Sequence, residues 1–266
     1  MGAVAPGYKA DLAVFDDLRT LNVKQVYKGG KLVAENGKML HQKEKNTDWS
    51  TEIKERVFHS FHRVPITVEE LQLKETTGTH QRVIDMVAHE LITKERIEEW
   101  KELPGVAPGV DISRDIVKLA AIERHKNTGH VGLGFLGKYG LKKGAVATSI
   151  GHDSHNLVIA GVTDEDMVLA GNRVIENGGG LAIALEGKVL ADLPLPIGGL
   201  MADEPVEVVD EKLEHMKKLS VELGISEDID AFMTLAFISL PVIPKLRLNT
   251  YGVVDVEKHQ VVEARF

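Results

Sequence analysis

The sequence contains no cysteine among its 266 residues. This absence excludes disulfide bonds, zinc sites with thiolate ligands and cysteine nucleophiles. Three other signatures of common enzyme classes are also missing: a His-x-His pair, a serine nucleophile elbow and a phosphate-binding loop of the Gly-Lys-Ser/Thr type. Chemistry that depends on any of these motifs is therefore not expected from this chain.

Long apolar runs and an N-terminal targeting segment are absent as well. The longest largely apolar stretch, residues 231–243, is interrupted by Thr234, Ser239 and Pro241, and it is too short to cross a bilayer. The N-terminus has no basic region followed by apolar residues, so we expect no signal peptide. These patterns predict a cytoplasmic protein that does not contact a membrane.

Basic residues are not in excess. The 32 lysines and arginines are outnumbered by 40 aspartates and glutamates, and the two signs are intermingled. Without a basic stripe that could displace counterions, binding to nucleic acid is not expected. The hydrophobic share of 43% and charged share of 27% are typical of a globular protein with a sizeable core.

The first forty residues form a distinct unit of short β-prone runs. The runs lie at 12–16, 23–27 and 31–34; Gly29-Gly30 separates the second run from the third, and Asn36-Gly37 follows the third. Short β-prone runs bounded by such turn residues predict small antiparallel strands and hairpins. Two or three strands cannot close a core alone, so residues 1–40 are expected to need a second layer from elsewhere. We interpret residues 41–64, which begin with a polar stretch, as a linker.

Residues 65–266 mix strands and helices in one layered domain. Helices are expected to begin near Thr163 and near Pro205, because acidic residues and proline are favoured in the first turn, and a third helix is expected at 229–238. The last twenty residues resemble a hairpin. Strands are predicted at 82–89, 116–122, 145–150, 157–160 and 181–185. This order predicts an α+β fold with mixed α/β layers.

The densest group of polar side chains lies between the predicted strands at 145–150 and 157–160. It consists of His152, Asp153, Ser154, His155 and Asn156. Such side chains can bind a metal, transfer protons or hydrogen-bond a purine edge, and loops at strand ends often carry function. The alternative is a turn held by its Asp, Ser and Asn side chains. We favour function, although the spacing of the two histidines does not define a metal geometry.

A glycine-rich segment at 132–137 has the glycine spacing of the dinucleotide-binding fingerprint but not its structural context. No helix is expected to open after it, and no acidic residue follows in a position to bind a ribose. We interpret this segment as a glycine-rich strand or loop. His125 and His130 could join His152 and His155 in an independent metal site, which the sequence leaves open.

Several segments of the chain resemble the adenine deaminase family of amidohydrolases. Residues 2–16, with Pro-Gly-Tyr-Lys-Ala-Asp-Leu at 6–12, look like the strand that follows the barrel in amidohydrolases. Three later segments resemble the C-terminal domain of bacterial and archaeal adenine deaminases in order and spacing: 124–129, 149–156 and 195–201. The resemblance covers nearly the whole chain.

The resemblance implies hydrolytic deamination of adenine to hypoxanthine and ammonia by a metal-bound hydroxide. It also implies manganese or iron held in a (β/α)8 barrel whose ligands include a His-x-His pair. A barrel takes about 250 residues, so we expect it to be absent here. The metal ligands of the barrel cannot be assigned to any position of this chain, and neither metal is expected to bind this chain alone. Met1 directly before the sandwich strand suggests a truncated gene or a fragment.

The resemblance also sets the expected domains, site residues and partners. Residues 1–40 would be the C-terminal part of the amidohydrolase β-sandwich, and 65–266 the adenine deaminase C-terminal domain. The expected partners are adenine, the barrel and a second copy of the chain in a homo-oligomer. The alternatives are a non-catalytic purine-binding or dimerisation module and the independent histidine site. The candidate catalytic residues are His152 and Asp153, and the candidate substrate-binding residues are Ser154, His155, Asn156, Gly199 and Met201.

Overall fold

The structure, a computed structural model, describes residues 2–40, 49–73 and 77–266. The chain divides into two compact units, Met1–Ser50 and Thr51–Phe266, which are described separately. Residues 41–48 of the predicted linker lie outside the described residues. Its second part contains a helix, α1 (Thr51–Phe58), which belongs to the second unit. The assignment of the two units to particular domains stays a prediction.

The first unit is a four-stranded antiparallel sheet, which confirms the predicted hairpins. Its strands, in the order in which they pair, are β1 (Leu12–Phe15), β2 (Val23–Lys28), β3 (Lys31–Glu35) and β4 (Lys38–Met39). The Gly29 amide at the β2–β3 turn donates a hydrogen bond of 2.7 Å to the Asp11 carboxylate. No side chain in residues 2–40 is fully buried, and Val14, Val23 and Met39 are 41%, 42% and 68% exposed. Within the described residues this sheet therefore has no core of its own.

The second unit is built on an eight-stranded sheet in the order β12-β11-β9-β10-β7-β8-β5-β6. Every neighbouring pair is antiparallel except β5 with β8. Five of these strands match the predicted ones, and β8 shows that the glycine-rich segment is a strand. The bounds are β5 (His80–Met86), β6 (Thr93–Glu99), β7 (Ile116–Ile122), β8 (Val131–Gly137), β9 (Ala145–Thr148), β10 (Leu157–Gly161), β11 (Gly180–Leu185) and β12 (Lys188–Pro194).

The helices of the second unit begin where capping residues occur in the sequence. The Thr163 side chain accepts a backbone amide in the first turn of α2 (Asp164–Glu176), and Pro205 directly precedes α3 (Val206–Glu222). Asp230 accepts two backbone amides of α4 (Ala231–Ile238), which therefore begins two residues later than predicted. Two short 3-10 helices complete the set, η1 (Glu69–Leu71) and η2 (Ile112–Arg114).

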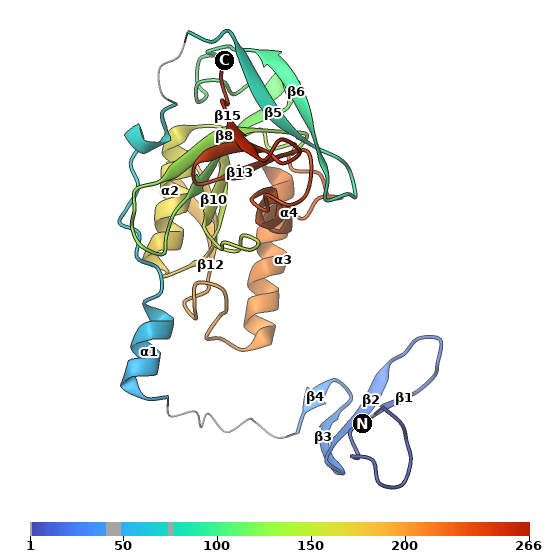
Figure 1. Cartoon of the computed structure of the whole chain (residues 1–266). Coiled ribbons are helices and arrows are strands. Elements are labelled where there is room, and N and C mark those ends of the chain that lie inside the picture. The colour runs from blue at the N-terminus through green and yellow to red at the C-terminus, as the bar shows by residue number, and fades with distance from the viewer. Residues whose placement is uncertain (1, 41–48, 74–76) are drawn as a thin grey trace. The chain divides into compact units, whose positions relative to one another are not determined.

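The central strands are apolar on both faces because both faces of the sheet are covered. In β9, Ala145 and Ala147 pack with Met167 of α2, whereas Val146 packs in the core that contains Phe232 of α4. Figure 1 shows α2 (yellow) and α3 (orange) with the sheet between them. Strands buried on both faces read as continuous hydrophobic runs rather than alternating ones, which is why the sequence revealed them.

A third sheet at the C-terminus packs on β7 and β8. It consists of β13 (Leu246–Asn249), β14 (Gly252–Asp255) and β15 (Gln260–Val262), paired antiparallel in that order. The predicted terminal hairpin is therefore two successive hairpins. The predicted mixed α/β class is confirmed, and none of the sheets of the described residues closes into a barrel. None of the described helices is long and apolar enough to span a bilayer.

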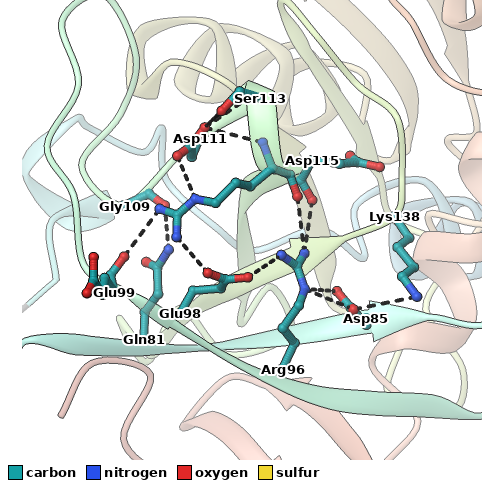
Figure 2. Close-up of polar contacts among 11 residues, drawn as sticks. Gln81, Asp85, Arg96, Glu98, Glu99, Gly109, Asp111, Ser113, Asp115 and Lys138 are labelled. Carbon is teal, nitrogen blue, oxygen red and sulfur yellow. Dashed lines mark hydrogen bonds and ion pairs between the residues drawn. The ribbon is translucent and has the colours of Figure 1, made fainter.

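A chain of alternating charges ties β5 and β6 to η2 (Figure 2). Arg96 binds Asp85 at 2.9 Å and Glu98 at 2.8 Å, while Arg114 binds Glu98 at 2.7 Å and Asp111 at 2.6 Å. The hydrogen bond from Arg96 holds the pKa of Glu98 below its ordinary value. Because each of these carboxylates is already paired, we interpret this network as structural rather than as a binding site.

Candidate functional site

The predicted site loop, residues 149–156, connects β9 to β10 near the middle of the main sheet. The two strands pair antiparallel and are buried, so both ends of the loop are held firmly. At the first end, the buried Ser149 hydroxyl donates to the Gly199 carbonyl at 2.6 Å and accepts from the Gly180 amide at 2.7 Å. Ser149 therefore joins this loop to the predicted substrate-binding segment around Gly199.

The two candidate catalytic residues form a carboxylate–imidazole pair on the surface. His152 Nδ1 lies 2.6 Å from the Asp153 carboxylate, and the two side chains are 54% and 80% exposed. Behind them, the His152 ring stacks on Phe237 of α4 at 5.3 Å between centroids. The His152 amide donates to the Ala236 carbonyl at 2.7 Å. Helix α4 therefore fixes both the backbone and the ring of His152.

The geometry of this pair suits proton transfer. If Nδ1 carries the hydrogen that faces Asp153, Nε2 is left as the free base, and it has no hydrogen-bond partner among the described residues. An imidazole oriented by a carboxylate and open to a ligand can accept or donate one proton. This is a chemical capability of the arrangement, and the catalytic role of His152 and Asp153 stays a prediction.

His155 is partly buried, whereas His152 is exposed. Its carbonyl accepts a hydrogen bond of 2.5 Å from Arg124 Nε, and its ring nitrogen Nδ1 lies 3.4 Å from the Gly151 amide. Burial lowers the pKa of His155, and the nearby positive charge of Arg124 lowers it further. A neutral imidazole is therefore favoured, which fits a hydrogen-bonding residue better than a cationic one.

Arg124 is the central connector of the site, and sequence reasoning did not select it. It is 2% exposed, donates to the His155 carbonyl and, at 3.1 Å, to the Gly198 carbonyl, and lies over the Phe61 ring. Its Nη1 is buried without a hydrogen-bond partner, as is Oδ1 of Asn156. One guanidinium thus holds together two of the segments that resemble adenine deaminases, and it lies in the third.

The loop between β7 and β8, residues 123–130, contacts the 149–156 loop and supports it. Glu123 accepts backbone hydrogen bonds from His125 at 2.5 Å and from Lys126 and Thr128 at 2.9 Å. Burial acts to raise the pKa of Glu123, but these hydrogen bonds outweigh it and lower the pKa to about 2. The ordered His125 ring then places Nε2 at 2.7 Å from the Ser154 carbonyl. Glu123 therefore acts on the candidate site through His125.

Of the two remaining predicted residues, Gly199 lies against Arg124 and Met201 lies at the surface. Gly199 lies against the Arg124 guanidinium: a Cβ atom added there would be 2.5 Å from Nη1. Met201 is 60% exposed and pairs with Ile197 across a short bridge. Among the described residues, no recorded contact brings Met201 to the His152 loop. A substrate-binding role for either residue stays a prediction.

The independent histidine metal site gains no support from the structure. His130 packs against Tyr251 with ring centroids 4.8 Å apart, and the Nε2 atom of His125 is engaged by the Ser154 carbonyl. Across the part of the chain that the structure describes, no three His, Asp or Glu side chains are grouped so that they could hold a metal ion.

Two functional candidates, Arg124 and Phe237, were not chosen from the sequence. Arg124 was visible within the segment 124–129, and its position directly after a buried strand was the available signal. Phe237 carried no signal, since an apolar residue in an apolar helix reads as core. Its stacking on His152 depends on tertiary packing alone.

Comparisons with known proteins point to one family. Residues 90–260 match the family described as "Adenine deaminase C-terminal domain". The chain is 44% identical over 263 residues to "Adenine deaminase 2" of Carboxydothermus hydrogenoformans, covering 98% of this chain and 45% of that protein. It is 42% identical over 259 residues to "Adenine deaminase" of Petrotoga mobilis, covering 97% of this chain and 44% of that protein.

The matched region contains the His152 loop, Arg124 and the segment around Gly199. The chain spans less than half the length of the curated relatives that it matches. The chain therefore belongs to the adenine deaminase C-terminal domain family.

Proposed function

We propose that the chain is the C-terminal part of an adenine deaminase, which converts adenine and water into hypoxanthine and ammonia. The observation that carries this proposal is the match of nearly the whole chain to less than half of each relative named adenine deaminase. We infer that the chain acts together with a barrel, in one longer chain or as a separate subunit. A cytoplasmic location and assembly into a homo-oligomer belong to the same proposal.

The metal of the reaction, manganese or iron, would be held by the barrel. The residues described here do not fit a resident metal, because they contain no suitable group of three His, Asp or Glu side chains. We therefore derive no step through the metal from this chain. On this proposal the isolated chain is inactive.

The first unit offers a surface on which such a barrel-bearing portion would dock. Its four-stranded sheet leaves Val14, Phe15 and Val23 about two-fifths exposed, and no side chain of residues 2–40 is fully buried. A sheet with one apolar face normally packs against a second layer. This supports the proposal that residues 1–40 complete a β-sandwich with strands from the barrel-bearing portion.

The His152 loop is proposed to approach the purine. His152 would move a proton to or from the reacting purine through Nε2, with Asp153 as its orienting carboxylate. Ser154, His155 and Asn156 would line the substrate, with Gly199 and Met201 on the neighbouring segment. The contacts of Arg124 with the His155 and Gly198 carbonyls support a common site for the two segments.

Ammonia release from adenine tests the assignment. We expect none from the 266-residue chain supplied with manganese or iron(II), and turnover when the chain is joined to the barrel-bearing portion of the Carboxydothermus hydrogenoformans relative. Turnover by the chain alone would refute the proposal that the reaction requires the barrel. Binding of adenine in calorimetry, without turnover in either form, would instead favour the purine-binding module.

Substitutions in the joined protein test the loop. His152→Gln should lower kcat by about 10²-fold or more, the lower end of what general acid–base groups contribute, and Asp153→Asn should lower it less. Because both side chains are exposed, the melting temperature should hardly change. His215→Gln, on the exposed side of α3, is the matched control. Unchanged kcat in both loop variants would remove the loop from the mechanism.

A further inference from the structure

A cavity of about 180 Å³ lies between α4, the turn that joins β5 to β6, and β13. Most of its wall is apolar, contributed by side chains such as Met86, Leu91, Phe237 and Ile238. A protein cavity of about 150 Å³ is known to bind benzene. This space, which we call the Arg247 cavity, is therefore large enough for one aromatic ring with a small substituent.

One wall of the Arg247 cavity carries a buried positive charge. Arg247 on β13 is 1% exposed, and its Nε donates to the Ile243 carbonyl at 2.8 Å. Its Nη2 donates to the carbonyls of Leu91 and Pro244. Nη1 of Arg247 donates no hydrogen bond to any described residue, and Arg247 lines the cavity.

No counter-ion for Arg247 is found among the described residues. The acidic residue on the cavity wall, Glu90, is exposed and forms no ion pair with Arg247 within the part of the chain described. Burial lowers the pKa of Arg247 to about 10, so the guanidinium is still charged at neutral pH. Buried charges in proteins are normally paired, so a guanidinium without a counter-ion among the described residues, on the wall of an apolar cavity, fits an anionic ligand.

The cavity is also in contact with the candidate site. The Phe237 ring lines the cavity and stacks on the His152 ring, 5.3 Å away with an interplanar angle of 22°. The carbonyl of the preceding residue, Ala236, accepts the His152 amide. A ligand that packs against Phe237 therefore changes the surroundings of His152 through one shared side chain.

We propose that the Arg247 cavity binds a small monoanion with an apolar body, of the aromatic carboxylate class, and transmits its occupancy to His152 through Phe237. The carboxylate accepts hydrogen bonds from Arg247 Nη1, and the ring fills the apolar part of the cavity. The regulatory meaning of this link rests on the proposed role of the His152 loop, whereas the binding site itself does not.

Benzoate and its neutral analogue benzyl alcohol test the proposal on the 266-residue chain. Calorimetry should show benzoate binding at least tenfold more tightly than benzyl alcohol, because only benzoate neutralises Arg247. Histidine ring signals in NMR spectra should show His152 shifting as benzoate saturates, with exposed His215 unmoved. These readouts need no catalytic activity, so they can fail or succeed independently of the deaminase proposal.

Two variants locate the binding. Met233→Trp places a larger side chain at the cavity wall from a residue that is 51% exposed, and it should weaken benzoate binding at least tenfold. Val206→Trp, at a 73% exposed position on α3, is the matched control and should leave binding unchanged. Arg247→Met should abolish the preference for benzoate, and Met233→Trp decides the matter if that variant does not fold. Equal affinity for the two probes, unweakened binding in Met233→Trp, or a His152 signal that does not shift would overturn the proposal.

Discussion

Glu123→Gln should destabilise the second unit in a way that disappears at low pH. The folded-state pKa of Glu123 is about 2, against an ordinary value of 4.5. That difference corresponds to about 3.4 kcal/mol at most, and the partly exposed position reduces it to ~1–2 kcal/mol through solvent screening. Because the folded-state pKa is lowered, this stability is present above pH 4.5 and is lost as the pH falls towards 2.

Urea unfolding of the wild type and the variant at several pH values measures this difference. At pH 7 the variant should be less stable by ~1–2 kcal/mol, and by pH 3 the gap should shrink to less than half. Glu211→Gln, at an exposed position on α3, controls for the loss of a surface carboxylate. A gap that is the same at pH 7 and pH 3 would refute the argument that the Glu123 carboxylate organises its loop.

Three further predictions concern the interior and the site. Gly199→Ala should lower the free energy of unfolding by ~1–3 kcal/mol more than Gly198→Ala does. Both glycines have positive φ, but only Gly199 lies against a side chain, that of Arg124. Thermal unfolding of the two variants checks this difference. Lys118→Met should lower the free energy of unfolding, measured in urea, by ~3–5 kcal/mol. The substitution removes the Lys118 ammonium, which lies 2.6 Å from the buried Asp164 carboxylate, and leaves that carboxylate without its ion-pair partner. NMR titration of His155 should give a pKa below that of a free histidine, because partial burial disfavours its charged form; a pKa at or above the ordinary value would contradict the partial burial of its ring.

The sequence predicted the interior of the sheet better than its edges. Strands β7 and β10 are buried on both faces, so their apolar runs are unmistakable. Edge strand β6 has the sequence TKERIEE and escaped prediction, as did β12 at the other edge. Charges on edge strands discourage pairing with other chains. In β6 they also bind β5, since Glu95 of β6 lies 2.6 Å from Arg82 of β5. Such a strand lacks the hydrophobic pattern on which sequence prediction depends.

The candidate site was only partly predictable for a related reason. Local density of polar residues was enough to select His152 and Asp153, which are neighbours in sequence. The contacts that join His155, Gly198 and Arg124 span 31 and 74 positions, and no local pattern encodes such separations. The resemblance to a family pointed to all three segments, but only the fold shows that a single guanidinium links them.

The placement of the 149–156 loop between two fully buried strands has a practical consequence for engineering. Strands β9 and β10 pair with β11 and β7 on their other edges, so side-chain substitutions at the tip of the loop should leave the pairing of these strands unchanged. A library that varies only the exposed tip at 152–154, with Ser149 and Arg124 left intact, would sample new ligand chemistries on an unchanged frame.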